Sequence, residues 1–283
     1  DDIIICDFEN ENDNLKNKKF SKIINPKNLL SFLKNNKNIR IIIHMGANSS
    51  TMVKDFKLMY SQNTRFSKDL WNWCKNRNIR FIYASSAAIY GDGSLGFNDK
   101  SSMETFRPLN VYGWTKYFFD RYVIKQANIN QNPPQWAGLR FFNVYGPNED
   151  HKGAMQSVLK HSFNQYNSDG IVKLYKSYNK NYGHGQQKRD FIYIKDCVSI
   201  IIWLINNHNI SGIFNCGTGK ARSFEDQAMA MYSSLKKQPN IKYIEMPSAL
   251  INQYQYYTKA DTNKIREYGY KNKFYSLENG VND

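Results

Sequence analysis

The strongest constraint on the fold is a series of short apolar runs, rich in β-branched residues, that alternate with helical segments up to about residue 142. Such runs occupy residues 3–6, 41–44 and 80–86. Strands buried on both faces read as nearly continuous hydrophobic runs, and strands separated by helices pair in parallel through right-handed crossovers. The sequence therefore predicts an α/β fold whose parallel sheet binds its ligand at the carboxyl ends of the strands.

Several segments outside these runs also have a predicted structure. Residues 56–77 are expected to form a helix with one apolar stripe, in which Asn63 is the polar exception. The stripe consists of Phe56, Met59, Tyr60, Phe66, Leu70, Trp73 and Cys74. Further along, the pattern predicts a loop at residues 128–135, a strand at 136–142, a helix at 155–166 and a mobile polar loop at 176–187.

A phenol and an ammonium group stand one helical turn apart at Tyr112 and Lys116. Residues at this spacing lie on the same face of a helix. A tyrosine titrates at a pH of about 10, but a nearby cation favours its phenolate and brings general-base catalysis closer to neutral pH. The spacing recurs by chance on solvated helices, so its weight depends on the neighbouring motifs.

Three strand ends supply that context. Ser86 ends the run at residues 80–86, the small residues of Met45 to Ser50 follow the run at 41–44, and Asp7 follows the first run. Small residues let the backbone approach a flat or phosphorylated ligand, and an acidic residue after a strand holds the adenosine ribose in dinucleotide folds. Separately each is a buried strand with a turn, but in this order they predict a nucleotide-binding sheet.

Composition limits the remaining function classes. The formal net charge of +15 invites a nucleic-acid interpretation, but the lysines are scattered among asparagine, tyrosine and isoleucine, as in proteins of AT-rich genomes, and no nucleic-acid motif accompanies them. Neither the four cysteines nor the five histidines have the spacing of a metal site. No apolar run approaches the roughly 20 residues of a membrane helix, and no signal peptide is visible. We therefore expect a cytoplasmic protein with no metal, nucleic-acid or membrane partner.

Four motifs resemble those of the extended short-chain dehydrogenase/reductases: residues 45–49, 85–91, 108–116 and 141–147. Residues 151–155, 188–193 and 215–219 are most similar to the ADP-glyceromanno-heptose 6-epimerases within that superfamily. The resemblance runs from about Asp2 to the last residue. It implies a bacterial isomerase that inverts C6 of ADP-D-glycero-D-manno-heptose and so supplies the heptose of the lipopolysaccharide inner core. The inversion would proceed through oxidation and re-reduction of the sugar by bound NADP, with NAD as the possible alternative cofactor. It also suggests a homo-oligomer, specifically a homopentamer.

The first βα unit of that family has no counterpart in this sequence. The family opens with a Gly-x-x-Gly-x-x-Gly turn, whose glycines and helix N-terminus receive the cofactor pyrophosphate. This chain begins at Asp1 in what resembles the family's second strand. We therefore expect a Rossmann-like, doubly wound parallel sheet without its first βα unit, in a fragment that also stops short of the last helix. An inactive remnant that binds no cofactor stays open as an alternative.

The resemblance implies two parts of the molecule and a set of site residues. Residues 1–142, with about 190–218 and 254–268, would form the NAD(P)-binding domain, and residues 143–189, with about 219–253 and 269–283, a smaller α/β substrate-binding lobe. Ser86, Tyr112 and Lys116 would be catalytic, and Lys152 would be the second base of an epimerisation. The implied cofactor contacts are Asp7, Phe8, Lys19, Lys27, Met45, Gly46, Ala47, Asn48, Ser49, Asn63, Lys116 and Val144.

Substrate contacts follow from the same resemblance. They are Ser86, Asn143, Ala154, His161, Tyr175, Lys176, Ser177, Tyr178, Arg189 and Tyr254. The chain departs from the family pattern at Ala154, where serine is usual, at Gln253, where arginine is usual, and at Lys176 and Tyr178 in the substrate loop.

Simpler roles and another enzyme class remain open for these residues. Asn143 could cap the turn after its strand, and Arg189 could pair with Asp190 or Asp196. A different nucleotide-sugar epimerase or dehydratase would keep the catalytic trio but would not need Lys152.

Overall fold

The computed structural model describes residues 2–8, 14–51, 53–251 and 254–283. The strands are β1 Ile4–Cys6, β2 Lys22–Ile24, β3 Ile41–His44, β4 Arg80–Ser86, β5 Trp136–Phe141, β6 Asn143–Tyr145, β7 Val172–Tyr175, β8 Lys188–Tyr193, β9 Gly212–Cys216, β10 Ala221–Ser223 and β11 Ile241–Ile244. The α-helices are α1 Leu29–Asn35, α2 Phe56–Met59, α3 Phe66–Arg77, α4 Val111–Asn128, α5 Val158–Asp169, α6 Ile194–Asn206, α7 Phe224–Ser234, α8 Ser248–Ile251, α9 Asn263–Glu267 and α10 Leu277–Asn282. Shorter helical turns are η2 Pro26–Asn28, the π-helix η3 Tyr60–Arg65, η4 Ala87–Tyr90, η5 Met103–Thr105 and η6 Asp150–Met155.

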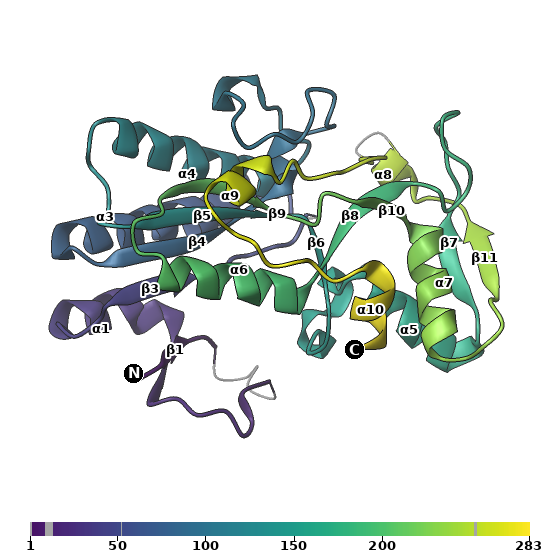
Figure 1. The fold of residues 1–283 in the computed structure, drawn as a ribbon, viewed down its shortest axis with the longest axis horizontal. Coiled ribbons are helices and arrows are strands. Elements are labelled where there is room, and N and C mark those ends of the chain that lie inside the picture. Colours follow the sequence, from purple (N-terminus) through teal and green to yellow (C-terminus); the bar gives the residue numbers. More distant parts are fainter. Residues whose placement is uncertain (1, 9–13, 52, 252–253) are drawn as a thin grey trace.

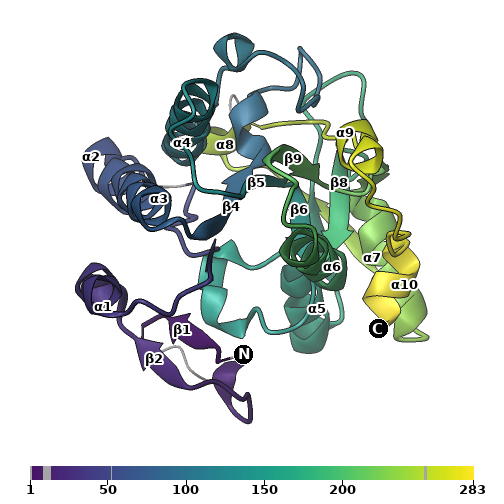
Figure 2. The same cartoon turned by 60° about the vertical axis from the view of Figure 1, so that its left-hand side comes forward.

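The central sheet has the order β3-β4-β5-β9, and all of its pairings are parallel (Figure 1). Alternate residues of β4 enter different cores, because successive side chains of a strand point to opposite faces. Phe81 and Tyr83 pack with residues of α1, α3 and α4, whereas Ile82 packs with residues of α6. Figure 2 shows α3 and α4 on one side of the sheet and α6 on the other. The predicted α/β fold with a parallel sheet is confirmed.

The helix predicted at residues 56–77 is confirmed as α2, η3 and α3 in succession. Met59, Leu70 and Cys74 are buried as expected, but Phe56 is 46 % exposed and the stripe prediction is wrong for it. The π-helix explains the difference, because its wider turn changes the face that the preceding residues present. The amide of Phe66 donates to the carbonyl oxygen of Ser61, five residues back.

The other predicted segments are confirmed with one shift. α4 ends at Asn128 and β5 begins at Trp136, so the loop and the strand lie where they were expected. The helix expected at residues 155–166 begins three residues later, at Val158. The reason is local, because the Ser157 side chain accepts a hydrogen bond from the amide of Lys160 and so caps the helix there.

The second half of the chain has its own sheets and its own apolar cluster. β8 lies between β10, which is antiparallel to it, and β6, which is parallel, while β7 pairs in parallel with β11. Side chains of these strands pack against α7 and the C-terminal helix α10. The predicted division into two domains stays a prediction.

The predicted strand at residues 3–6 is found as β1. It pairs in parallel with β2 in a two-stranded sheet that is separate from the central one, so the prediction that this run joins the sheet of residues 41–44 and 80–86 is wrong. Its residues are exposed or half-buried, so it is not the buried strand that the apolar run predicted. In the part of the chain that the structure describes, no helix combines the length and apolar character needed to span a membrane.

Candidate active site

The end of β4 and the start of α4 bring a serine and a tyrosine together. The Asn110 side chain accepts a hydrogen bond from the amide of Gly113 at 2.9 Å and so caps α4. Tyr112 therefore stands in the first turn of the helix. Its hydroxyl is hydrogen-bonded to Ser86, the last residue of β4. The pair lies at the carboxyl edge of the central sheet, where open α/β folds carry their ligand sites.

Lys116 lies one turn further along α4 and is only 4 % exposed. Its Nζ donates to the carbonyl oxygen of Ala84 at 2.7 Å and lies 5.9 Å from the centre of the Tyr112 ring. Burial lowers the pKa of Lys116 to about 8, against the opposing charge of Asp120. Burial raises the pKa of Tyr112, and the hydrogen bond with Ser86 opposes that rise. The predicted lowering of the tyrosine pKa by Lys116 is not found, because the ammonium is directed at Ala84.

Beneath this trio lies a buried ion pair that the sequence did not suggest. Arg140 donates from Nε to Asp120 at 3.0 Å, and the two side chains are 1 % and 0 % exposed. The same carboxylate accepts hydrogen bonds from the hydroxyls of Tyr83, at 3.0 Å, and Ser85, at 2.9 Å. Asp120 thereby joins α4 to β4 and β5. The position of Asp120, one turn after Lys116, places it on the same face of the helix and could have drawn attention to it. Its partner Arg140, however, lies 20 residues further along the chain.

Asn63 fixes the loop that follows β3. Its Oδ1 accepts a hydrogen bond from the amide of Asn48 at 2.8 Å, and its Nδ2 donates to the carbonyl oxygen of Asn48 at 2.9 Å and to Thr115 Oγ1 at 3.1 Å. At Gly46, an added methyl group would meet no atom within 4 Å. The protein's own packing thus does not require glycine there, which fits a surface that a flat ligand approaches closely.

The remaining residues predicted to bind the cofactor lie outside that loop in the sequence. Asp7 follows β1 and accepts a hydrogen bond from the amide of Phe8 at 2.8 Å. Lys27 lies in η2 and, like Lys19, is exposed. Val144 lies in β6 and packs against the core beside α6.

His44, at the end of β3, is a partly buried titratable group that no spacing pattern indicated. Its Nε2 lies 2.9 Å from the Ser67 hydroxyl. Burial, followed by the charge of Lys116, lowers the pKa of His44 to about 3. The imidazole is therefore neutral at physiological pH, and it adds no second positive charge beside the lysine.

Arg189 is a buried cation among aromatic rings. It is 7 % exposed, and its guanidinium carbon lies 5.1 Å from the centre of the Tyr254 ring and 5.3 Å from that of Phe224. The alternative pairings with aspartates are not found. The Asp190 carboxylate accepts hydrogen bonds from the backbone amides of residues 218, 219 and 260, and that of Asp196 accepts one from the amide of residue 275. Among the described residues no carboxylate pairs with this guanidinium, which suits it to an anionic ligand.

Other predicted substrate residues are distributed over the second half. The Lys176 ammonium and the Tyr178 hydroxyl both bind the Glu245 carboxylate, just after β11. The backbone carbonyl oxygens of Tyr175 and Lys176 accept hydrogen bonds from the Gln187 side chain, and the Ser177 amide donates to His184 Nδ1. His161 Nε2 lies 3.4 Å from the carbonyl oxygen of Ala154, and Asn143 begins β6.

The predicted second base is not joined to the trio in this structure. Lys152 Nζ lies 3.5 Å from a carboxylate oxygen of Glu149, and its side chain is 43 % exposed. No described contact connects it with Tyr112. The Gln253 position lies outside the described residues, so its departure from the family pattern has no structural account.

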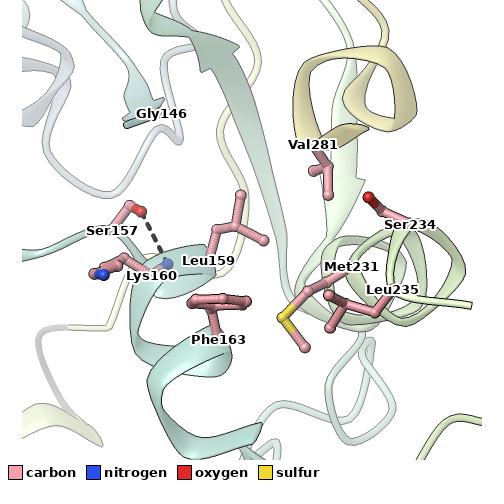
Figure 3. A pocket seen from close by; sticks show the side chains of 9 residues that line it. All are labelled: Gly146, Ser157, Leu159, Lys160, Phe163, Met231, Ser234, Leu235 and Val281. Atoms are coloured by element: carbon pink, nitrogen blue, oxygen red, sulfur yellow. Dashed lines mark hydrogen bonds between the residues drawn. The ribbon is translucent and has the colours of Figure 1, made fainter. Parts of the chain in front are cut away.

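A hollow lies between α5, α7 and α10 (Figure 3). Its walls are Gly146, Ser157, Leu159, Lys160, Phe163, Met231, Ser234, Leu235 and Val281. None of them belongs to the predicted site. Nor does any group of three or more metal-ligating side chains occur among the described residues.

Comparisons with known proteins agree with this geometry. The family model described as the NAD dependent epimerase/dehydratase family matches residues 2–217. The chain belongs to this family. The description of this NAD-dependent family indicates a nicotinamide cofactor.

Two relatives and one solved structure in this family carry the same enzyme name. The ADP-L-glycero-D-manno-heptose-6-epimerase of Fusobacterium nucleatum is 46 % identical over 297 residues, which cover 100 % of this chain and 89 % of that protein. The protein of that name in Brachyspira hyodysenteriae is 42 % identical over 99 % of this chain and 88 % of its own length. The Helicobacter pylori enzyme of that name has a similar structure, with a TM-score of 0.80 and 26 % identity over 99 % of this chain and 85 % of that one.

Proposed function

We propose that this chain inverts C6 of ADP-D-glycero-D-manno-heptose to give ADP-L-glycero-D-manno-heptose, for the heptose of the lipopolysaccharide inner core. The observation that carries the reaction class is the hydrogen bond between Ser86 and Tyr112, beside the buried Lys116, at the carboxyl edge of the central sheet. The substrate is proposed from the relatives that share one enzyme name. The family description alone also fits the alternative of another nucleotide-sugar epimerase or dehydratase.

In the proposed reaction a bound nicotinamide cofactor would accept the hydride from C6 and later return it. The Tyr112 side chain, as its phenolate, would take the proton of the C6 hydroxyl while the hydride leaves C6, so that a ketone remains, and Ser86 would hydrogen-bond the same oxygen. Lys116 holds a positive charge near the phenol and binds the nicotinamide ribose. Inversion requires that the ketone presents its other face, and Lys152 would give and take the proton on that side.

The proposed cofactor site combines the loop after β3 with the end of β1. Asn63 holds residues 45–49 in place through Asn48, and Gly46 leaves its surface open. Asp7 would accept hydrogen bonds from the adenosine ribose, while Phe8 and Val144 would line the pocket. We propose NADP rather than NAD because Lys19 and Lys27 could bind a 2′-phosphate. A ratio of KM values for the two cofactors that favours NAD would contradict this preference.

The proposed substrate site lies in the second half of the molecule. Arg189 is buried without a carboxylate partner among the described residues, and its planar fork matches a diphosphate. Tyr254 would cover the guanidinium, while Asn143, Ala154, His161 and residues 175–178 would contact the sugar nucleotide. We also propose the two-domain division at about residue 142, a cytoplasmic location and a homo-oligomer, which sedimentation can test.

The experiment follows the configuration at C6 by NMR during incubation of the protein with ADP-D-glycero-D-manno-heptose. Tyr112→Phe should reduce turnover by roughly 10²-fold to 10⁴-fold, the range for removal of a general acid or base. Tyr122→Phe is the matched control. It removes a tyrosine hydroxyl from the same helix, but this hydroxyl donates to the side chain of Asn72 and not to a residue of the proposed site. Full activity of Tyr112→Phe would refute the proposed chemistry.

Lys152→Ala distinguishes the proposed epimerase from the alternative enzymes. It should abolish inversion, whereas Lys173→Ala, which removes an exposed lysine paired with Asp169, should leave it intact. An unimpaired Lys152→Ala variant would favour another nucleotide-sugar enzyme. The 283-residue chain should be assayed beside a form that carries a glycine-rich βα unit at its N-terminus, since turnover by neither form would favour the inactive alternative.

A further inference from the structure

The segment between β7 and β8, residues 176–187, folds back on itself at the end of β7 (Figure 1). The amide of Ser177 donates to His184 Nδ1 at 3.0 Å, and the amide of Gly185 donates to the carbonyl oxygen of Tyr175 at 3.3 Å. These bonds hold the segment together, but they do not fix its direction relative to Arg189. That direction depends on contacts with other parts of the chain.

The Tyr256 side chain makes two such contacts and a third with Tyr254. Its hydroxyl accepts a hydrogen bond from the amide of Tyr178 at 3.1 Å. Its ring lies 5.5 Å from that of Tyr182 and 5.2 Å, edge to face, from that of Tyr254. The carbonyl oxygen of Tyr256 also accepts a hydrogen bond from the amide of Lys188 at 2.9 Å. The residue therefore touches the loop on one side and Tyr254 on the other.

Tyr254 continues this chain of contacts to the buried cation. Its ring lies 5.1 Å from the Arg189 guanidinium carbon, and β8 places Arg189 directly after Lys188, to which Tyr256 is bonded. Movement of the Tyr256 side chain would thus release the loop and the ring over Arg189 together. Tyr256 therefore links the position of the loop with that of the cation, as Phe224 does at the other end of the loop through its amide, which donates to the carbonyl oxygen of Gln187.

We infer that Tyr256 is a positioning residue for the nucleotide diphosphate of the substrate: it holds residues 176–187 and Tyr254 in a fixed arrangement around Arg189. This inference rests on the proposed function, because it takes Arg189 as the diphosphate site. Tyr256 need not touch the substrate. Its effect is on how much ordering the loop requires when the nucleotide binds, and therefore on affinity rather than on chemistry.

Glu245 is another anchor of the loop, beside the amide of Glu225, which donates to the carbonyl oxygen of Gly185 at 3.0 Å, and we expect Glu245 to be weaker than Tyr256. It binds Lys176 and Tyr178, but its side chain is 65 % exposed. Ion pairs in solvent contribute little, because water competes for both charges. The half-buried rings around Tyr256 do not face that competition. Removal of Glu245 should therefore perturb nucleotide binding less than removal of Tyr256.

The test compares Tyr256→Phe and Tyr256→Leu with the wild type, using ADP-D-glycero-D-manno-heptose for kinetics and ADP alone for calorimetric binding. Tyr256→Phe loses only the hydrogen bond to the loop, so KM should rise about threefold. Tyr256→Leu also loses the ring contacts, so KM and the Kd of ADP should rise tenfold or more, while kcat changes less than twofold. Tyr257→Leu, at the exposed neighbouring position, is the matched control and should leave all three values unchanged.

The two proposals fail in different ways. A wild type that binds ADP but does not turn over the heptose would refute the proposed function, and ADP affinity of the variants would still test the inference. A Kd for ADP within twofold of the wild-type value in Tyr256→Leu would overturn the positioning role. So would a fall in kcat without a change in KM, or wild-type protein that binds no ADP. Equal unfolding free energies of the two Tyr256 variants and the wild type would exclude a general loss of structure as the cause.

Discussion

Replacement of Asp120 by alanine should cost more stability than any surface change in this chain. The carboxylate accepts hydrogen bonds from Arg140, Tyr83 and Ser85, and it is fully buried. The two hydroxyls can rotate toward other acceptors, but the guanidinium would stay buried without an anion. Breaking a buried ion pair from one side costs about 3–5 kcal/mol, a large part of the roughly 5–15 kcal/mol of a typical native protein.

Urea unfolding followed by far-UV circular dichroism measures this loss. Asp120→Asn should lose less than Asp120→Ala, because the amide oxygen still accepts hydrogen bonds without the charge. The double variant Asp120→Leu/Arg140→Met should recover much of the stability, since apolar replacement of a buried pair is often neutral. Asp69→Asn, on the exposed side of α3, is the control and should change stability by no more than about 0.5 kcal/mol. A cost below about 1 kcal/mol for Asp120→Ala, or additive effects in the double variant, would refute the reasoning.

Three further predictions concern His44, Gly217 and Asn63. Burial lowers the pKa of His44 from its ordinary value of 6.5 to about 3 in the folded protein, so protons bind the unfolded chain more tightly. Stability therefore falls as the pH drops from about 6.5 toward 3. On going from neutral pH to pH 5, His44→Gln should lose about 2 kcal/mol less unfolding free energy than the wild type. An equal loss in the two proteins, measured by urea unfolding at each pH, would contradict this prediction. Gly217→Ala should destabilise the fold by about 1–3 kcal/mol, because its methyl group would lie 2.6 Å from the Cβ of Ala260. Thermal unfolding measures this loss, and Gly46→Ala, the control, should unfold like the wild type. Asn63→Ala should raise the KM for the cofactor about tenfold, because the loop after β3 loses the hydrogen bonds that fix it. An unchanged KM would show that the loop is ordered without these bonds.

The placement of the proposed catalytic residues was accessible from the sequence because its geometry is local. Asn110 caps α4, helical spacing puts Tyr112 and Lys116 on one face, and the apolar run before Ser86 marks a buried strand. Each of these depends on residues within a few positions of one another. The same is true of the helix start at Val158, which Ser157 explains once the capping contact is seen.

The parts that sequence reasoning missed depend on residues far apart in the chain. Arg140 is the partner of Asp120, and Tyr256 reaches Tyr178 across 78 residues. The lowered pKa of His44 comes from burial that only the packed helices create. Local patterns contain no information on such contacts, because they arise when separate elements pack together.

The π-helix between α2 and α3 makes the length of that segment critical. An α-helix turns by about 100° per residue, so deleting one residue between Tyr60 and Arg65 would rotate one half of the helix by that angle against the other. Either Leu70 and Trp71 would leave the core under β4, or Asn63 would turn away from Asn48. Substitutions in this segment can be absorbed one side chain at a time, but a single-residue deletion would force the protein to give up either its packing or the loop that follows β3.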